Sequence, residues 1–194
     1  MVRWEPNARG RLVQAAMELF IERGFEQATV ADIARRAGLT ERTFFRHFAD
    51  KREVLFWGQG ALRELIVETV ASAPPSAAPI DVVTAAYEAA GGMLQEGRDF
   101  SRQRQAVINA NPELQERELI KLASLAAAVA DALRQRGVPD QAASLAAQAG
   151  TTVFRIAFER WVSAPGEPGE TGEPDLPRLI RESLGELRDV TAGK

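Results

Sequence analysis

Residues 29–53 place hydroxyl and basic side chains at the spacing of two short helices joined by a tight turn. Thr29 and Thr40 can each accept a hydrogen bond from the backbone at the start of a helix. Arg42 and Thr43 follow within the first turn of the second helix, where guanidinium and hydroxyl groups can contact the base edges and phosphates of DNA. The turn is short enough to set the second helix into a major groove. The segment therefore predicts a helix-turn-helix.

The apolar residues of this segment repeat at helical spacing. Phe44 and Phe48 lie four residues apart, so we assign both to the core. Asp50 followed by Glu53 repeats the capping pattern and predicts a third helix start at Lys51. The inward face of the first helix is assigned to Val30, Ile33, Ala34 and Ala37. A purely structural helix corner with solvated charges has the same local pattern, so the segment alone leaves both interpretations open.

Composition excludes most other chemistry. The chain has one histidine and no cysteine. It therefore offers no thiolate metal site and no set of nucleophile, base and orienting group, and we expect neither an enzyme nor a metal or other cofactor. No apolar run approaches the roughly 18 residues of a membrane span, and no apolar segment of the secretory type follows the N-terminus. We expect a cytoplasmic protein with no membrane partner.

The net charge of −3 is unevenly distributed along the 194 residues. Residues 1–56 carry ten Lys or Arg and eight Asp or Glu, whereas residues 57–194 carry 14 and 19. The positive end is the helix-turn-helix end. Because the local field governs attraction to phosphate, a negative whole chain is compatible with DNA binding.

Residues 7–56 resemble the DNA-binding domain of the tetracycline-repressor (TetR) family of bacterial regulators in residue type, order and spacing. The matching residues are Ala15, Leu19, Phe20, Gly24, Phe25, Thr29, Ile33, Ala34, Ala37, Gly38, Thr40, Phe48 and Lys51. The resemblance implies an all-α fold, with an N-terminal three-helix helix-turn-helix DNA-binding domain and a larger C-terminal helical ligand-binding and dimerisation domain. It favours DNA binding over a structural corner.

The resemblance also implies roles for individual residues. His47 and Lys51 correspond to phosphate contacts of the family, and the start of the next helix would strengthen the contact of Lys51. The alternatives are a surface histidine and a solvated lysine. The family usually has tyrosine where this chain has Phe45, which can stack or contact a thymine methyl but cannot donate a hydrogen bond. The candidate DNA-contacting residues are Thr29, Arg42, Thr43, Phe45, His47 and Lys51.

The string Thr-Phe-Phe-Arg-His-Phe at residues 43–48 resembles a subgroup that includes mycofactocin-system regulators, some of which respond to acyl-CoA. It implies a small hydrophobic or acyl-type effector, with a planar hydrophobic drug as the alternative. The candidate effector-binding residues are Tyr87, Met93, Arg104, Phe154 and Phe158. Aromatic and Met side chains at helical spacing are more often core residues. Arg102, Arg104 and Arg155 could instead pair with acidic residues.

Apolar periodicity and Gly or Pro breaks predict the remaining organisation. We expect helices at residues 7–23, 51–71, 80–95, 100–110, 113–136, 140–162 and 175–190, around the pair within 29–53. The domains are predicted at residues 7–53 and 54–190. Residues 140–162 and 175–190 correspond to the family's dimer bundle, with two helices from each subunit, and Leu184 is assigned to that interface.

Together these features predict a homodimeric, ligand-responsive repressor of a palindromic DNA operator. The two recognition helices, residues 40–47 of each subunit, must lie about 34–36 Å apart. An effector would displace the helix at residues 51–71 and change that spacing, through a reciprocal coupling of about 1–3 kcal/mol. The alternative is a helical protein-interaction module without an inducer pocket. The sequence specifies neither the effector nor the operator.

Overall fold

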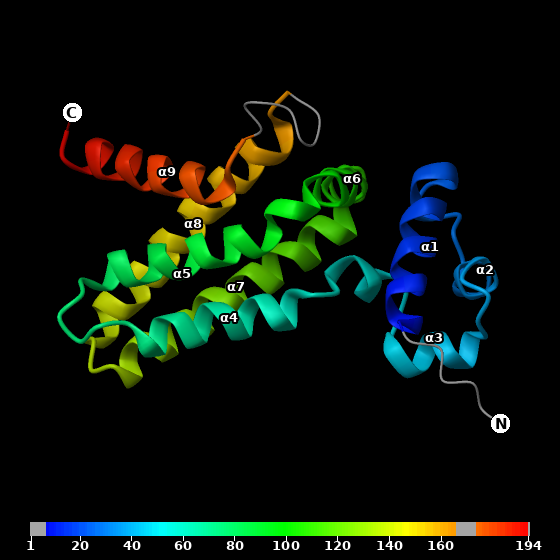
Figure 1. Cartoon of the computed structure of the whole chain (residues 1–194), viewed down its shortest axis with the longest axis horizontal. Coiled ribbons are helices and arrows are strands. Elements are labelled where there is room, and N and C mark those ends of the chain that lie inside the picture. The colour runs from blue at the N-terminus through cyan, green and yellow to red at the C-terminus, as the bar shows by residue number, and fades with distance from the viewer. Residues whose placement is uncertain (1–6, 166–173, 194) are drawn as a thin grey trace. The chain divides into compact units, whose positions relative to one another are not determined.

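The computed structural model describes residues 7–165 and 174–193, and within them it contains helices and no strand, which confirms the all-α prediction (Figure 1). Two 3-10 segments, η1 (Arg52–Phe56) and η2 (Gln95–Gly97), interrupt the α-helices. The α-helices are α1 (Ala8–Arg23), α2 (Val30–Arg36), α3 (Glu41–His47), α4 (Gln59–Ser72), α5 (Pro79–Leu94), α6 (Arg98–Asn109), α7 (Pro112–Gln135), α8 (Asp140–Ser163) and α9 (Leu176–Thr191). Across the described ranges, no helix has both the length and the apolar character needed to cross a membrane.

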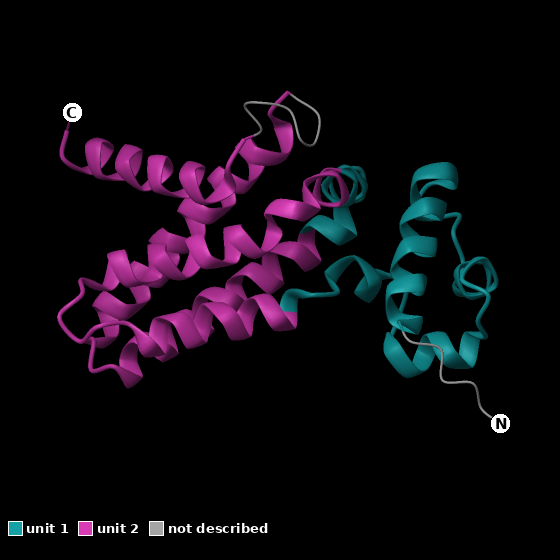
Figure 2. Cartoon of the chain, viewed as in Figure 1, with its two compact units in different colours: residues 1–59, 103–115 teal, residues 60–102, 116–194 magenta. Residues whose placement is uncertain are grey.

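The chain divides into two compact units (Figure 2). Unit 1 comprises residues 1–59 and 103–115, and unit 2 comprises residues 60–102 and 116–194. The sequence prediction placed a single boundary after residue 53. Unit 1 extends beyond that point and also includes the end of α6 and the start of α7, which the prediction had assigned to the second domain.

Local capping explains the helices of unit 1. Asn7 accepts a hydrogen bond from the backbone N–H of Gly10 at 3.1 Å and starts α1, and Gly24, at φ 85°, ends it. Thr29 and Thr40 cap α2 and α3, as predicted. The apolar sides of these helices form one core with the α6–α7 corner. Its buried members include Leu12, Phe20, Phe25, Ile33, Phe44, Phe48, Leu55, Val107, Ile108 and Leu114.

The helix predicted at residues 51–71 is wrong in its first half. Asp50 does start a helical segment, because its Oδ1 accepts from the N–H groups of Arg52 at 2.9 Å and Glu53 at 3.0 Å. That segment is the short η1. Gly58 then adopts φ 90°, a left-handed value that breaks the helical path, and α4 begins only at Gln59. The two pieces therefore lie on either side of a glycine break.

Unit 2 is a helical assembly in which α5, α8 and α9 pack on one another (Figure 1). Glycine permits the closest approaches. A Cβ at Gly150 would lie 2.2 Å from Val83 Cγ1, and a Cβ at Gly91 would lie 3.0 Å from Ile180 Cδ1. The absence of a side chain at Gly91 thus lets α9 pack closely against α5. The unit 2 core is centred on Tyr87, Leu133, Phe154, Trp161 and Ile180.

Candidate nucleic-acid interface

Helix α3 is a seven-residue helix with one buried side and one open side. Thr40 fixes its start by accepting a hydrogen bond from the N–H of Thr43 at 3.2 Å. Phe44 and Phe48 face the core of unit 1 and are buried. The opposite side exposes four side chains, which we call the α3 face: Glu41, Arg42, Phe45 and Arg46. The inward phenylalanines thus determine which residues point outward.

The α3 face combines two arginines with an exposed phenyl ring. Neither Arg42 nor Arg46 forms a hydrogen bond or ion pair with any residue that the structure describes. The ring of Phe45 is 56% exposed and meets only the edge of Phe44, with centroids 5.5 Å apart at 83°. Two uncompensated cations beside an apolar group match the phosphates and base edges of a duplex.

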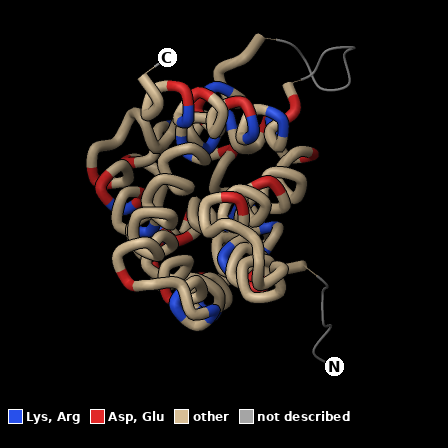
Figure 3. Tube along the Cα trace, turned by 90° about the vertical axis from the view of Figure 1, so that its left-hand side faces the viewer, with Lys and Arg blue, Asp and Glu red and all other residues tan. Residues whose placement is uncertain are grey.

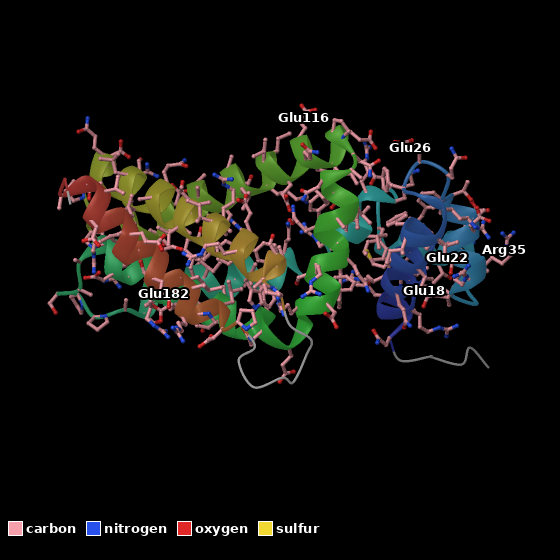
Figure 4. The ribbon with its side chains drawn as sticks, turned by 90° about the horizontal axis from the view of Figure 1, so that it is seen from above. Glu18, Glu22, Glu26, Arg35, Glu116 and Glu182 are labelled. Carbon is pink, nitrogen blue, oxygen red and sulfur yellow. The ribbon has the colours of Figure 1, made fainter. Side chains whose placement is uncertain are left out.

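Most other cations of unit 1 already have partners. Arg36 bridges to Glu22 at 2.7 Å and Glu18 at 3.2 Å, which ties α2 to α1, and hydrogen bonds from this arginine lower the pKa of Glu22. Glu18 and Glu22 come from α1 and are labelled in Figure 4. Arg35 pairs with Asp32 within α2. These ion pairs neutralise the charges of the α2 arginines in unit 1. Among the described residues of unit 1, the arginines without an acidic partner include Arg42 and Arg46 on α3 and Arg9 and Arg23 on α1.

Of the two predicted threonines, Thr29 caps α2, and Thr43 lies in the first turn of α3, which Thr40 caps. The Thr29 hydroxyl donates to Asp32 Oδ2 at 2.7 Å and accepts from the N–H of Asp32 at 3.1 Å. Its proton is thus committed within α2, and hydrogen bonding from Thr29 lowers the pKa of Asp32. The Thr43 hydroxyl lies 3.0 Å from that of Thr40. Only one of these two hydroxyls donates across this contact, so the proton of the other is available to DNA.

Lys51 occupies a different place from the one predicted. Its ammonium donates to the carbonyl oxygens of Phe25 at 2.8 Å, Glu26 at 3.2 Å and Ala28 at 3.2 Å, and it lies 4.3 Å from the centroid of the Phe25 ring. An ammonium has three donors, and all three are used. Lys51 therefore holds the α1–α2 turn closed, and its contact with a DNA phosphate stays a prediction.

His47 lies at the end of α3, half-buried, and its Nε2 atom is buried without a hydrogen-bond partner among the described residues. Burial lowers its pKa, with further contributions from the positive charges of Arg46 and Arg9. Arg9 comes from α1, where its guanidinium lies 6.0 Å from the centroid of Phe48. The sequence analysis did not select Arg9, because nothing local relates position 9 to position 47.

The predicted effector residues are only partly brought together. Tyr87 is fully buried, its hydroxyl lies 2.7 Å from that of Thr151, and burial raises its pKa to about 12. Its ring stacks on Phe154 at 5.0 Å, and Phe158 follows at 5.9 Å. These three form an aromatic row between α5 and α8. Met93, by contrast, is 54% exposed.

Arg104 does not belong to this group. It lies in unit 1, where its Nε donates to the carbonyl oxygen of Leu55 at 2.6 Å and its guanidinium lies 5.2 Å from the centroid of Phe56. These contacts lie within unit 1, and a role of Arg104 toward an effector anion stays a prediction. Arg155 forms an ion pair with Glu159 at 2.9 Å, which supports the alternative stated for it. Among the described residues, no three His, Cys, Asp or Glu side chains are grouped as a metal site requires.

Comparison with known proteins shows that the N-terminal helix-turn-helix region is similar to bacterial transcriptional regulators. Residues 12–56 match the model described as bacterial regulatory proteins, tetR family. Streptomyces glaucescens TcmR, an HTH-type transcriptional regulator, is 35% identical over 91 residues, 47% of this chain and 40% of TcmR. The putative mycofactocin biosynthesis transcriptional regulator MftR of Mycobacterium tuberculosis is 49% identical over 43 residues, 22% of this chain and 21% of MftR. The matched stretches thus cover less than half of each relative.

Unit 2 and the fold of the whole chain are also similar to regulators of this kind. Residues 77–192, more than half of the chain, match the MftR C-terminal domain model. The crystal structure of Thermus thermophilus FadR, described as a TetR family repressor in complex with lauroyl-CoA, superposes with a TM-score of 0.55 at 23% identity and covers 93% of each chain. At that identity the likeness concerns the fold alone. The chain belongs to the TetR family of bacterial regulatory proteins, with a C-terminal domain of the MftR type.

Proposed function

We propose that the chain is a DNA-binding transcriptional repressor that binds a palindromic operator as a homodimer and leaves it when a small hydrophobic or acyl-type effector binds. The observation that carries the DNA part is the α3 face, on which Arg42 and Arg46 have no partner in the described chain while Phe45 is exposed. Its geometry is that of a recognition helix, whose residues reach base edges from the major groove. Arg9 of α1 adds a further positive charge near this face, and the neutral ring of His47 lies at the end of the same helix.

The test is selection of a binding site from randomised duplex DNA, followed by fluorescence anisotropy at several salt concentrations. We expect an enriched palindrome whose half-site centres lie about 34–36 Å apart or a multiple of this distance. Affinity should fall steeply with salt because phosphate contacts release counterions. A scrambled duplex of equal length is the control. Enrichment of no sequence, or equal binding of the scrambled duplex, would exclude an operator-binding role.

The dimer surface is proposed on α8. Leu145 is 72% exposed and Ile156 39% exposed, on a stripe that includes Ala149 and Thr152 at helical spacing. A small and apolar stripe on a long helix suits close packing against a second copy. Leu184, assigned to the interface from sequence, is only 6% exposed and belongs to the core of its own chain. The dimer proposal therefore rests on α8 and no longer on Leu184.

Paired variants separate dimer loss from unfolding. Leu145→Asp should convert dimer to monomer in sedimentation at micromolar concentration while the helical circular dichroism stays intact. Leu184→Asp should instead lower the free energy of unfolding by several kcal/mol, because it buries an unpaired charge. A wild type that sediments as a monomer would contradict the two-half-site mechanism, and a dimeric Leu145→Asp would place the interface elsewhere.

The effector is proposed to bind in unit 2, near the aromatic row of Tyr87, Phe154 and Phe158. Support comes from the apolar character of this row and from the shared fold with FadR, whose structure contains lauroyl-CoA. The experiment adds lauroyl-CoA, coenzyme A alone or a planar hydrophobic dye to the protein–operator complex. Release by lauroyl-CoA but not by coenzyme A supports the proposal. Phe158→Ala is expected to change the lauroyl-CoA concentration needed for release. Met93→Ala, at an exposed position, is the matched control. Release by nothing would favour the alternative, an interaction module without an inducer pocket.

A further inference from the structure

Phe45 is an unusual residue for an exposed helix face. Its ring is 56% exposed, whereas Phe44 and Phe48 of the same seven-residue helix are buried. It lies between the two arginines of the α3 face, three residues after Arg42 and one before Arg46. The phenyl ring has no atom that donates or accepts a conventional hydrogen bond. Its surface can therefore gain binding energy by covering an apolar group of the partner.

The major groove offers one such group. Among the base edges exposed there, guanine, cytosine and adenine present hydrogen-bond donors and acceptors, and only thymine presents a methyl, at C5. The flanking arginines match the phosphates and the guanine acceptors that surround such a methyl. We propose that Phe45 packs against the C5-methyl of one thymine in each half-site and thereby fixes a thymine at that operator position. This inference rests on the proposed function, in which α3 enters the major groove.

The expected size of the effect follows from burial of a single methyl group. Removing one buried methyl lowers affinity by about fourfold, the factor that corresponds to about 0.8 kcal/mol. A palindrome carries the contact twice, so removal from both half-sites lowers affinity by roughly 15-fold for a dimer. This is large enough to measure by anisotropy and small enough that the complex survives.

The test uses the operator selected by the wild-type protein, with thymines replaced by deoxyuridine one symmetric pair at a time. Deoxyuridine removes the methyl and leaves every base-pairing and groove hydrogen-bonding atom unchanged. Wild type should show one symmetric pair at which the loss is roughly 15-fold. Phe45→Ala should bind the unmodified operator more weakly and lose its sensitivity at that pair, while Phe45→Leu, which keeps an apolar side chain, should retain part of it. Because Phe45 is exposed, these variants should melt like wild type.

A second experiment tests the same methyl group on a base other than thymine. At the sensitive position, a duplex with 5-methylcytosine should bind wild type about fourfold per half-site better than one with cytosine, and Phe45→Ala should not distinguish the two. If deoxyuridine has no effect at any position, or if Phe45→Ala keeps the wild-type sensitivity, the inference is wrong while operator binding stands. If wild type selects no sequence at all, the proposed function is wrong and the inference with it.

Discussion

Helices α3 and α9 both expose arginines, but the two helices leave them in opposite states. On α3, Arg42 and Arg46 have no acidic partner in the described part of the chain. On α9, each arginine is paired with an acid: Arg178 with Glu182 at 2.7 Å, Arg181 with Glu88 at 2.7 Å, and Arg188 with Asp81. Basic and acidic residues lie interspersed along the chain, so charge density alone does not distinguish the two helices (Figure 3). The missing acidic partner is what distinguishes a surface suited to a polyanion.

The largest expected effect tests this contrast directly. Arg42→Ala or Arg46→Ala should weaken operator binding by about 1–3 kcal/mol, because each removes a donor that no other group replaces. Arg178→Ala and Arg181→Ala remove exposed arginines that are already paired with acids. They should leave operator affinity within about twofold. The measurement is anisotropy at fixed salt, and equal losses for both pairs would show that total charge matters and pairing does not.

The next effect concerns Lys51, a cation of unit 1 whose partners are backbone carbonyl oxygens. Lys51→Met keeps the aliphatic stem and removes three hydrogen bonds to backbone carbonyls. The free energy of unfolding should fall by roughly 1–3 kcal/mol, because the carbonyl oxygens lose a charged donor. Urea denaturation measures this, with Arg42→Met as the exposed control that should unfold like wild type. The salt slope of DNA binding should change for Arg42→Met only. A reduced slope with unchanged stability for Lys51→Met would support its phosphate role.

The smallest effect is a pH dependence at His47. Its pKa in the free protein is lowered from 6.5 by burial and by Arg46 and Arg9, so the ring is neutral at pH 7. DNA phosphates would offset those charges and raise the pKa, so binding takes up a proton and affinity rises as pH falls from about 7.5 to 6. The stability of the unbound protein should change with pH in the opposite direction. Its folded pKa lies below the unfolded one, so its stability falls as pH drops through 6.5.

A titration of affinity against pH checks this linkage. We expect a rise of about threefold per protomer between pH 7.5 and 6 for wild type, and a flat profile for His47→Gln. The glutamine keeps a hydrogen-bonding side chain without a titrating group. An unchanged slope in His47→Gln would assign the proton to another residue.

Local signals in the sequence were sufficient for three of the helix starts in unit 1. Thr29, Thr40 and Asp50 each accept the backbone hydrogen bonds that their positions predicted, because capping depends on residues within one turn. The break at Gly58 was also local, but the periodic apolar residues around it suggested one continuous helix. Periodicity alone does not show where a glycine takes a left-handed conformation.

Roles that depend on distant partners could not be predicted in this way. The partners of Lys51 lie 23 to 26 residues earlier in the chain, and the partner of Arg104 lies 49 residues earlier. The sequence shows a basic residue in each case, and only the fold shows whether its donors are already used. The same holds for Arg42, whose availability depends on which acids the fold brings near.

The α6–α7 corner limits how independently the DNA-binding unit can be exchanged between regulators. Val107, Ile108 and Leu114 are buried in the same core as the helix-turn-helix, although residues 60–102 of unit 2 separate them from it in sequence. A fragment cut after residue 59 would expose the apolar surface that these side chains cover. Head-swap chimeras joined at one point would therefore inherit a mismatched core, and exchanging DNA specificity between relatives requires two grafted segments, residues 7–59 and 103–115.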